Sequence, residues 1–509
     1  MMRKIPKHIE GYGEVREFSG VFSDMNVKKL TQVHVKPKCP GERKIFLSIK
    51  EFFDKFPPFD GMTLSFHHHL RNGDSVINLV FSVLERYDVK DICLVSSSFF
   101  PVHEPMVKWI ESQKVVKIYT NYMSGPVAKC VSSGKLKYPV IMQTHGGRAR
   151  AIESGEVKID VAFIAAPSCD EYGNMNGVYG KSACGVLGYA HVDADYANHV
   201  VAITDNLVPY PNTSIEIFQH KIDSVIVVES IGNPKGIVSG TTQITKDPLG
   251  LKIAKMAAKV IEYSGYLKEG FSFQTGAGGT SLAVAKEVKK LMISKNITGS
   301  FASGGITGYM VEMLKEGLFK TLFDVQCFDL DAIQSVKENP RHQAMSASLY
   351  GNPHCKGAIV NNLDVVILGA TEVDINFNVN VTTASNGMIM GGSGGHSDTA
   401  AGAKLTIIVT NLVKARLPIV KEMVTTITTP GESVDVVVTE RGIAVNPKHV
   451  DLIEILKSEG LSLYTIEELK EMAYSITGVP SEISFENKII GVVEYRDGSV
   501  IDVIYPMKG

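Results

Sequence analysis

The sequence has few of the features that mark secreted, membrane or nucleic-acid-binding proteins. Its seven cysteines are scattered and form no CxxC pair, which predicts reduced thiols without a disulfide framework or a metal site. No apolar run approaches the roughly 18 residues that a membrane helix needs, and the first residues lack the apolar core of a signal peptide. The net charge of −2 offers no basic surface for nucleic acid or anionic lipid. We therefore expect a soluble, cytoplasmic protein with no nucleic-acid or membrane partner.

The middle of the chain repeats itself after about 205 residues. His191-Val192-Asp193 is matched by His396-Ser397-Asp398, and Asn206-Leu207-Val208 is matched by Asn411-Leu412-Val413, each pair 205 positions apart (396 − 191; 411 − 206). Two buried strands resemble each other easily, but a polar H-x-D followed by N-L-V in both copies is harder to obtain by chance. A period of this length indicates a duplicated domain, since solenoid repeats have periods of about 20 to 50 residues.

Short apolar runs alternate with helical patterns in both copies, which is typical of a mostly parallel sheet covered on both faces. We predict an α/β protein of two duplicated, doubly wound domains. Residues 1–45 form an N-terminal extension, 46–228 the first domain, 229–250 a linker rich in glycine, threonine and proline, and 251–509 the second domain with a C-terminal tail. A ligand is expected in the crevice between the two domains.

Two glycine-rich segments are candidates for contacting a substrate through backbone amides. Segment 274–284 reads QTGAGGTSLAV and segment 391–398 reads GGSGGHSD. Glycine lets amides approach a phosphate, a carboxylate or a developing oxyanion, although such loops also serve close packing or surface turns. The candidates for thioester binding here are Gly276, Gly278, Gly279, Gly391 and Gly392, and the candidates for catalysis are Gly394, Gly395 and His396.

Cationic and imidazole side chains gather at loop positions of the first copy. Segment 65–74 reads SFHHHLRNGD and segment 144–150 reads THGGRAR. Arginine offers a bidentate fork for carboxylates, so these segments predict an anion site, with packing or surface roles as the alternative. Three consecutive histidines point in different directions and have no partner at ligand spacing, so no metal is expected. The candidate substrate-binding residues are His67, His68, Arg71, His145 and Arg148.

Asparagines alternate along the extended stretch ATEVDINFNVNV at residues 370–381. Alternation on an extended chain places their amides on one face, where a bound acyl group could reach them. Asn378 is therefore a further catalytic candidate, and capping of turns is the alternative that the pattern leaves open.

Several of these segments together resemble the CoA-transferase superfamily. The resemblance rests on GITGYMVEMLKEGL (305–318), EVDINFNVN, GGSGGHSD and VVTERGIAVNP (437–447), and it implies two α/β halves with the active site between them. Within the superfamily, SFHHHLRNGD, HGGRARAIESGE and KIDVAFIAAPSCDEYGNMNG are similar to the alpha subunits of citrate lyases. The resemblance covers about residues 45 to 509.

This resemblance implies an activity and a set of partners. The expected reaction transfers an acyl carrier thiol, or CoA, from an acetyl thioester to citrate, giving a citryl thioester and acetate. A beta subunit would then cleave the citryl thioester, and a gamma subunit would be the acyl carrier, in a complex with self-association of this chain. No cofactor is expected to be tightly bound, because acetyl-CoA or the phosphopantetheine group of the carrier is a substrate. The alternatives are a general acyl-CoA:carboxylate CoA-transferase or thioesterase of the same fold, a sugar-phosphate isomerase-like or ligand-sensing protein, and a non-catalytic scaffold.

One position departs from the pattern of the superfamily. Many CoA-transferases carry a glutamate nucleophile in a segment that corresponds to residues 305–310, where this chain has Tyr309. The preceding Gly304 and Gly305 remain candidates for thioester binding. The departure implies that a carboxylate of citrate attacks the acetyl thioester directly and that the released thiolate then attacks the mixed anhydride, without a glutamyl thioester.

Overall fold

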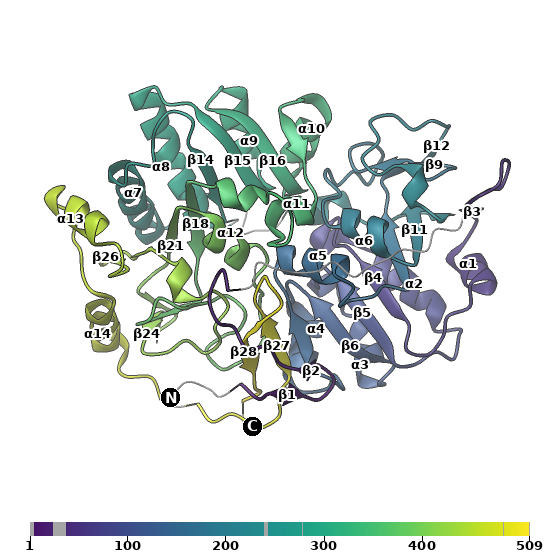
Figure 1. The fold of residues 1–509 in the computed structure, drawn as a ribbon, viewed down its shortest axis with the longest axis horizontal. Helices are drawn as coiled ribbons and strands as arrows, with labels where there is room; N and C mark the ends of the chain where they lie inside the picture. Colours follow the sequence, from purple (N-terminus) through teal and green to yellow (C-terminus); the bar gives the residue numbers. More distant parts are fainter. Residues whose placement is uncertain (1–4, 24–36, 239–242, 277, 482, 508–509) are drawn as a thin grey trace.

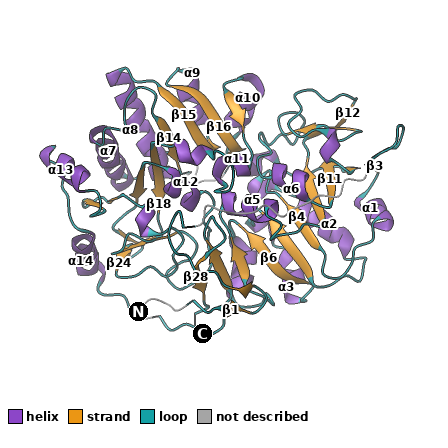
Figure 2. Cartoon of the chain, viewed as in Figure 1, coloured by secondary structure: helices purple, strands orange, loops and turns teal. Residues whose placement is uncertain are grey.

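Two α/β halves lie side by side in the computed structural model of the chain (Figure 1), which describes residues 5–23, 37–238, 243–276, 278–481 and 483–507. Each half has a central sheet with helices on both faces (Figure 2). The strands in the middle of the sheets are buried on both faces, as the five residues VAFIA of β8 (Val161–Ala165) illustrate. Continuous apolar runs of this kind predicted parallel strands, and the structure confirms the predicted fold class.

The first sheet has ten strands in the spatial order β28-β27-β7-β6-β5-β4-β8-β11-β13-β3, and all neighbours pair in parallel except β27 and β28. Besides β8, the strands are β3 (Ile45–Phe46), β4 (Thr63–Phe66), β5 (Ile92–Ser96), β6 (Val115–Thr120), β7 (Val140–Met142), β11 (His199–Thr204), β13 (Ser224–Val227), β27 (Gly491–Glu494) and β28 (Val500–Ile504). Its helices are α1 (Ile49–Lys55), α2 (Val76–Leu84), α3 (Met106–Glu111), α4 (Gly125–Ser132), α5 (His145–Glu153) and α6 (Ala190–Tyr196).

The second sheet has the order β17-β16-β15-β14-β18-β21-β25-β26. Its strands are β14 (Ser272–Thr275), β15 (Gly299–Ile306), β16 (Phe319–Cys327), β17 (His342–Ala344), β18 (Val365–Gly369), β21 (Leu405–Val409), β25 (Val436–Val438) and β26 (Ile443–Val445). The helices are α7 (Pro248–Tyr263), α8 (Gly279–Lys295), α9 (Gly308–Lys315), α10 (Leu330–Glu338), α11 (Ala347–Gly351), α12 (His396–Gly402), α13 (Val450–Ser458) and α14 (Ile466–Thr477).

The two sheets share one topology over seven strands, which confirms the duplication. The order β7-β6-β5-β4-β8-β11-β13 of the first half is repeated as β17-β16-β15-β14-β18-β21-β25. The two matched histidines lie on the corresponding helices α6 and α12, but one position apart. The amide of the residue that ends each helix donates to the carbonyl of Asp193 in α6 and to that of Thr399 in α12, so Asp193 and Thr399 occupy equivalent positions. His191 therefore corresponds to Ser397 rather than to His396.

A small three-stranded sheet follows the central strands in each half. The first-half side sheet has the order β10-β9-β12, and the second-half side sheet has the order β20-β19-β24. In both, the first pair of strands is antiparallel and the second pair is parallel. The strands are β9 (Ser168–Asp170), β10 (Met175–Asn176) and β12 (Leu207–Val208), and β19 (Glu372–Asp374), β20 (Val379–Asn380) and β24 (Val420–Lys421).

The C-terminal tail extends the sheet of the first half, although the sequence assigned it to the second domain. Strand β27 pairs in parallel with β7, with Val492 opposite Ile141, and β28 continues the edge. Val492, Val500 and Val503 are fully buried and pack with Ile9 of the N-terminal hairpin β1 (His8–Ile9) and β2 (Gly13–Glu14). The apolar residues of these strands are buried at every position and do not reveal which sheet edge the strands join, so only the observed pairing places them.

Candidate functional site

The two halves meet through loops and helix ends that contact one another reciprocally. The first amide of α5, at His145, donates to the carbonyl of Gly394 in the second half at 2.9 Å. The first amide of the corresponding helix α11, at Ala347, donates to the carbonyl of Gly188 in the first half, also at 2.9 Å. Each half thus caps a helix of the other. The segment before α12 and the N-terminus of α5 form one continuous seam.

The glycines of segment 391–395 are required because the two halves pack closely against each other at this seam. A side chain at Gly392 would place its Cβ 2.2 Å from the carbonyl oxygen of Asn121 in the first half, and one at Gly395 would lie 2.2 Å from the hydroxyl of Tyr350. Gly391 accepts a hydrogen bond from Met123 at 3.0 Å, and Gly394 has a φ of +51°. Close packing, the alternative that the sequence left open, therefore accounts for much of this segment. It brings Gly394 against the ring of His145, because a Cβ there would lie 3.3 Å from Nε2.

His145 stands at this seam with one ring nitrogen unpaired. Its Nε2 accepts a hydrogen bond from the hydroxyl of Tyr189 at 3.0 Å, whereas its buried Nδ1 has no partner among the described residues. Burial, aided by the charge of Arg148, lowers the pKa of His145 to about 3. The imidazole is therefore neutral, and Nδ1 is available to a group that enters the seam. The tyrosine ring lies between His145 and His68, at 4.7 and 4.8 Å between ring centroids.

His68 joins the two halves directly. Its Nε2 donates to the side-chain oxygen of Gln326 in β16 at 2.8 Å, and the amide of Gln326 donates back to the His68 carbonyl at 2.9 Å. Its Nδ1 accepts from the hydroxyl of Ser97 at 2.5 Å. Burial, together with the nearby His145 and Arg71, holds the pKa of His68 well below its usual value. The ring is neutral and fixed in orientation.

Arg71 supplies the positive charge beside these histidines. It begins the short 3-10 helix η1 (Arg71–Gly73) with a φ of +53°, a strained conformation for a residue with a side chain. Its guanidinium lies 4.5 Å from the ring centre of Phe328 in the second half and 5.7 Å from that of Phe100. One hydrogen bond, 3.3 Å long, goes to the carbonyl of Ile237. Among the residues that the structure describes, no carboxylate forms an ion pair with it.

Two other predicted substrate-binding residues have their polar atoms hydrogen-bonded to partners within the first half. The Nε2 of His67 accepts a hydrogen bond from the amide of Ala165 at 2.9 Å. Arg148 contacts both carboxylate oxygens of Asp193, at 2.9 and 3.0 Å, and their side chains are each 2% exposed. The charge of Arg148 is already neutralised by Asp193. Arg148 is therefore not available to bind an anionic substrate, in contrast to Arg71.

His396 and Asn378 are likewise held by their own half. The Nε2 of His396 donates to the carbonyl of Gly369 at 2.9 Å, and its Nδ1 accepts from the hydroxyl of Thr429 at 2.7 Å. Burial lowers its pKa to about 4. The Asn378 side chain donates to Asp374 at 3.2 Å and accepts from the amide of Gly431 at 2.9 Å. Both side chains fix loops rather than face the seam with a free atom.

The remaining glycines lie where β14 and β15 of the second half end. Gly304 has a φ of +107°, and a Cβ there would lie 2.7 Å from the side-chain nitrogen of Gln274, while one at Gly305 would meet the ring of Phe328. Gln274 donates to the hydroxyl of Tyr350 at 2.8 Å and accepts from Ser303 at 2.9 Å. Gly278 caps α8 and Gly279 is its first residue, and the amide of Gly276 donates to the carbonyl of Ile367 at 2.7 Å.

Tyr309 packs on the core of the second half. It is the second residue of α9 and has the ammonium of Lys289 5.6 Å from its ring centre. Burial and the neighbouring glutamates raise its pKa. The raised pKa keeps this phenol protonated, which disfavours it as a nucleophile.

A carboxylate of the second half caps the helix that carries His145. Asp398 accepts from the Thr144 hydroxyl at 2.8 Å and from the Gly146 amide at 2.9 Å, and the Nε of Arg496 in the tail lies 3.6 Å from it. Burial raises the pKa of Asp398 to about 6. The tail therefore supports the seam, in addition to extending the first sheet.

Several residues of the cluster were missed by the sequence reasoning. A single tyrosine, serine or glutamine carries no pattern. The usable hints were the position of Tyr189 just before a helix in a duplicated segment and that of Gln274 at the start of the glycine-rich segment 274–284. The missed residues are Ser97, Tyr189, Gln274, Gln326, Tyr350 and Arg496. Among the described residues there is no group of three or more histidine, cysteine or acidic side chains placed to hold a metal. No helix in the described part of the chain is long and apolar enough to cross a membrane.

Comparisons with known proteins agree on one family. A family model described as citrate lyase, alpha subunit (CitF), matches residues 42–507. The citrate lyase alpha chain of Haemophilus influenzae is 50% identical over 467 residues, which cover 92% of this chain and 93% of the relative. A solved structure from Streptococcus mutans, described as an alpha subunit of citrate lyase in complex with citrate, is 48% identical, with a TM-score of 0.96 over 100% of this chain and 99% of that one.

More distant structures share the fold alone. The alpha subunit of a malonate decarboxylase from Acinetobacter baumannii is 13% identical, with a TM-score of 0.64 over 86% of this chain and 85% of that chain. The high identity over nearly the full length of the citrate lyase chains, together with the two-half architecture and its interface of histidine and arginine, settles the assignment. The chain belongs to the citrate lyase alpha subunit family, and it is an enzyme of the CoA-transferase type.

Proposed function

We propose that the chain transfers an acyl carrier thiol, or CoA, from an acetyl thioester to citrate, with the reaction taking place at the seam between the halves. The observation that carries the proposal is Arg71, a strained and partly buried cation without a carboxylate partner among the described residues. Burying an unpaired charge is costly, so the site is built for an anion that comes from outside. A carboxylate of citrate meets this requirement, and its planar pair of oxygens matches the guanidinium fork.

The neutral histidines beside Arg71 hold the substrate without adding charge. Nδ1 of His145 and the amides around Gly394 lie on the same seam, where they can contact a hydroxyl or a second carboxylate of citrate. Neutral imidazoles suit this task, because protonated ones would tie the citrate carboxylate in ion pairs and weaken it as a nucleophile. In this proposal the cations of the first half bind citrate, as the sequence predicted, but Arg71 acts with His68 and His145 and without Arg148.

The chemistry then proceeds in two acyl transfers. A carboxylate oxygen of citrate attacks the thioester carbonyl, the carbon–sulfur bond breaks, and a mixed anhydride of acetate and citrate forms with release of the thiolate. The thiolate attacks the citryl carbonyl of the anhydride, acetate leaves, and a citryl thioester is produced. One thioester replaces another, so positioning two anions and a thioester in contact is the main demand on the protein.

Each tetrahedral intermediate carries an oxyanion that needs hydrogen-bond donors. Removing one such donor typically costs about 3 to 4 kcal/mol of barrier. The side-chain amide of Gln274 and the hydroxyl of Tyr350 are candidates on the second half, together with the helix terminus that begins at Gly278 and Gly279. We place the thioester on that side, with the carboxylate of citrate on the Arg71 side.

The partners follow from this chemistry. We propose a citrate lyase complex in which a beta subunit cleaves the citryl thioester and a gamma subunit carries the thiol on a phosphopantetheine group, so that no cofactor is permanently held by this chain. We further propose self-association of the chain and a cytoplasmic location, where citrate and acetyl thioesters are both present.

The test is to incubate the purified chain with acetyl-CoA and a panel of carboxylates and to identify the acyl-CoA products by mass. Citryl-CoA and acetate should form with citrate in far greater yield than the products of the other acids. Equal use of several monocarboxylates would favour a general CoA-transferase, and release of free CoA without a new thioester would indicate a thioesterase. Either result would overturn the proposal.

A further inference from the structure

The duplicated side sheets of the two halves differ in what covers them. Helix α14 lies beside β24 at one end of the molecule, whereas β9 and β12 lie at the other end (Figure 1). The helix buries Ile466, Leu469 and Ala473 against the core of the second half, which includes Val420 of β24. The second-half side sheet is thereby covered by an amphipathic helix of the same chain.

The same position of the first-half side sheet is open. By strand register the counterpart of Leu207 is Val420 rather than Leu412, its match in the sequence repeat, because Leu207 pairs with Cys169 of β9 and Val420 pairs with Val373 of β19. Val420 is fully buried, but 41% of Leu207 is exposed. The two side sheets thus have the same topology, but the apolar residue of the second-half sheet is covered by α14, whereas the equivalent residue of the first-half sheet faces solvent.

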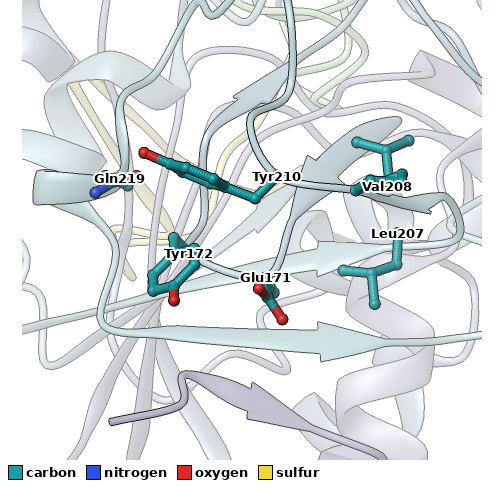
Figure 3. Close-up of a pocket in the computed structure, with 7 residues that line it drawn as sticks. Glu171, Tyr172, Leu207, Val208, Tyr210 and Gln219 are labelled. Carbon is teal, nitrogen blue, oxygen red and sulfur yellow. The ribbon is translucent and has the colours of Figure 1, made fainter. Parts of the chain in front are cut away.

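A hollow of about 760 Å³ surrounds this exposed leucine. Figure 3 shows the side chains of its lining around an open space. Tyr172 and Tyr210 pack edge to face, with 4.9 Å between ring centres, and are 37% and 53% exposed. The lining consists of Glu171, Tyr172, Leu207, Val208, Pro209, Tyr210 and Gln219. Aromatic and aliphatic side chains around one carboxylate are typical of a protein interface rather than of free surface.

Charged residues near the two side sheets indicate the sign of charge expected on the missing partner. In the second half, Lys470 of α14 pairs with Glu422, next to β24, with 2.8 Å between Nζ and Oε2. Glu171 is exposed on the first-half side sheet and has no ion pair among the described residues. Glu171 does not occupy the position of Glu422, which corresponds to Pro209 by strand register. A helix that covered this hollow with a lysine or arginine at its edge would nevertheless form an ion pair with Glu171.

We propose that the first-half side sheet is the docking surface for an amphipathic helix of another subunit in the complex. The helix presents aliphatic residues at the spacing i, i+3, i+7 seen in α14 and a basic residue toward Glu171. The inference rests on the proposed function, since it takes the partner to be a subunit of that complex. Helix-in-groove binding of this kind is carried by such anchors.

The decisive variants are Leu207→Asp and Glu171→Lys, with Ile293→Asp on α8 as a matched control at another exposed apolar residue. The full chain is mixed with its purified partner subunits, and assembly is followed by sedimentation. Leu207→Asp should weaken assembly at least tenfold and Glu171→Lys several-fold, while the control assembles normally. All three chains should form citryl-CoA from acetyl-CoA at the wild-type rate, which separates this inference from the proposed function.

Cross-linking identifies the occupant. A photoreactive phenylalanine in place of Tyr210 should cross-link, in the assembled complex, to one face of a helix in a partner subunit. Normal assembly of the Leu207→Asp variant, or a cross-link to a second copy of this chain or to a non-helical segment, would refute the proposal. Protection of residues 207–210 from hydrogen exchange only in the complex is the corresponding positive result.

Discussion

At the scale of single residues, the structure separates two arginines that look equivalent in the sequence. Arg71 has no carboxylate partner in the described part of the chain, whereas Arg148 is fully buried against Asp193. We predict that Arg71→Ala raises the KM for citrate about 10- to 100-fold and leaves the KM for acetyl-CoA nearly unchanged, because a contact to bound substrate appears in KM.

Arg148→Ala is the contrasting change. It leaves the carboxylate of Asp193 buried without its partner, and breaking a buried pair in this way costs about 3 to 5 kcal/mol. Its main effect should be a lower free energy of unfolding in denaturant titrations, with an unchanged citrate KM in the fraction that stays folded. An effect on citrate binding equal to that of Arg71→Ala would show that the two residues share one site.

The carboxylate of Asp398 gives the seam a pH dependence. Burial raises its pKa in the folded state from 3.8 to about 6, so the folded chain binds a proton that the unfolded chain releases at lower pH. The resulting stability is present below the unfolded pKa and is lost as the pH rises through 6. Relative to Asp398→Asn, the wild type should therefore lose roughly 1 kcal/mol between pH 5 and pH 7, as measured by urea titration at each pH. A difference that stays constant with pH would contradict this assignment.

Sequence reasoning identified segments that meet at the seam better than it identified which of their atoms are left unpaired there. His68, Arg71 and His145 were predicted from clustered imidazole and guanidinium groups, and they do lie together at the seam. His396 was an equally good candidate, but Thr429 and Gly369 occupy both of its ring nitrogens. Such partners come from distant parts of the chain, so residue type and spacing cannot reveal them. For the same reason Gln326 and Tyr350 could not be anticipated.

At the scale of elements, the tail provides the clearest difference from the predicted organisation. The sequence placed the tail in the second domain, but residues 491–494 occupy the edge of β7 in the first sheet, and that edge is set by long-range packing. The duplicated core was more predictable, because its continuous apolar runs alternate with helices in both copies. The glycines at 391–395 were recognised as unusual, whereas their role in close packing of the halves became clear only from distances such as 2.2 Å at Gly392.

We predict that a chain ending at Glu486 loses the stability of the first half. The truncation removes β27 and β28, uncovers the edge of β7, and exposes apolar side chains that β27 and β28 pack against, each worth about 1.5 to 3 kcal/mol when buried. It also removes Arg496 from Asp398. The melting temperature should fall by about 10 °C or more, or the chain should aggregate, in calorimetry beside a control chain ending at Pro506. An unchanged melting curve would mean that the tail is not part of the folded first half.

At the scale of the whole molecule, the site exists only where the two halves meet. Gln326 reaches His68, Phe328 stacks on Arg71, and Gly394 caps the helix of His145. A reaction that uses both halves together favours simultaneous binding of both substrates. Tyr309, which the sequence resemblance aligns with the glutamate of many CoA-transferases, packs on the second-half core.

We therefore predict kinetics of a ternary complex. Initial rates measured over a grid of acetyl-CoA and citrate concentrations should give intersecting double-reciprocal lines, because citrate must be bound before the acetyl thioester can react. A glutamyl thioester intermediate would instead give the parallel lines of a ping-pong mechanism. The same distinction applies to the protein itself: exposure to acetyl-CoA followed by borohydride or hydroxylamine should leave the chain unmodified and fully active, as read by intact mass. A covalent adduct on any residue of 305–316 would place a nucleophile in the second half and would require the direct attack by citrate to be abandoned.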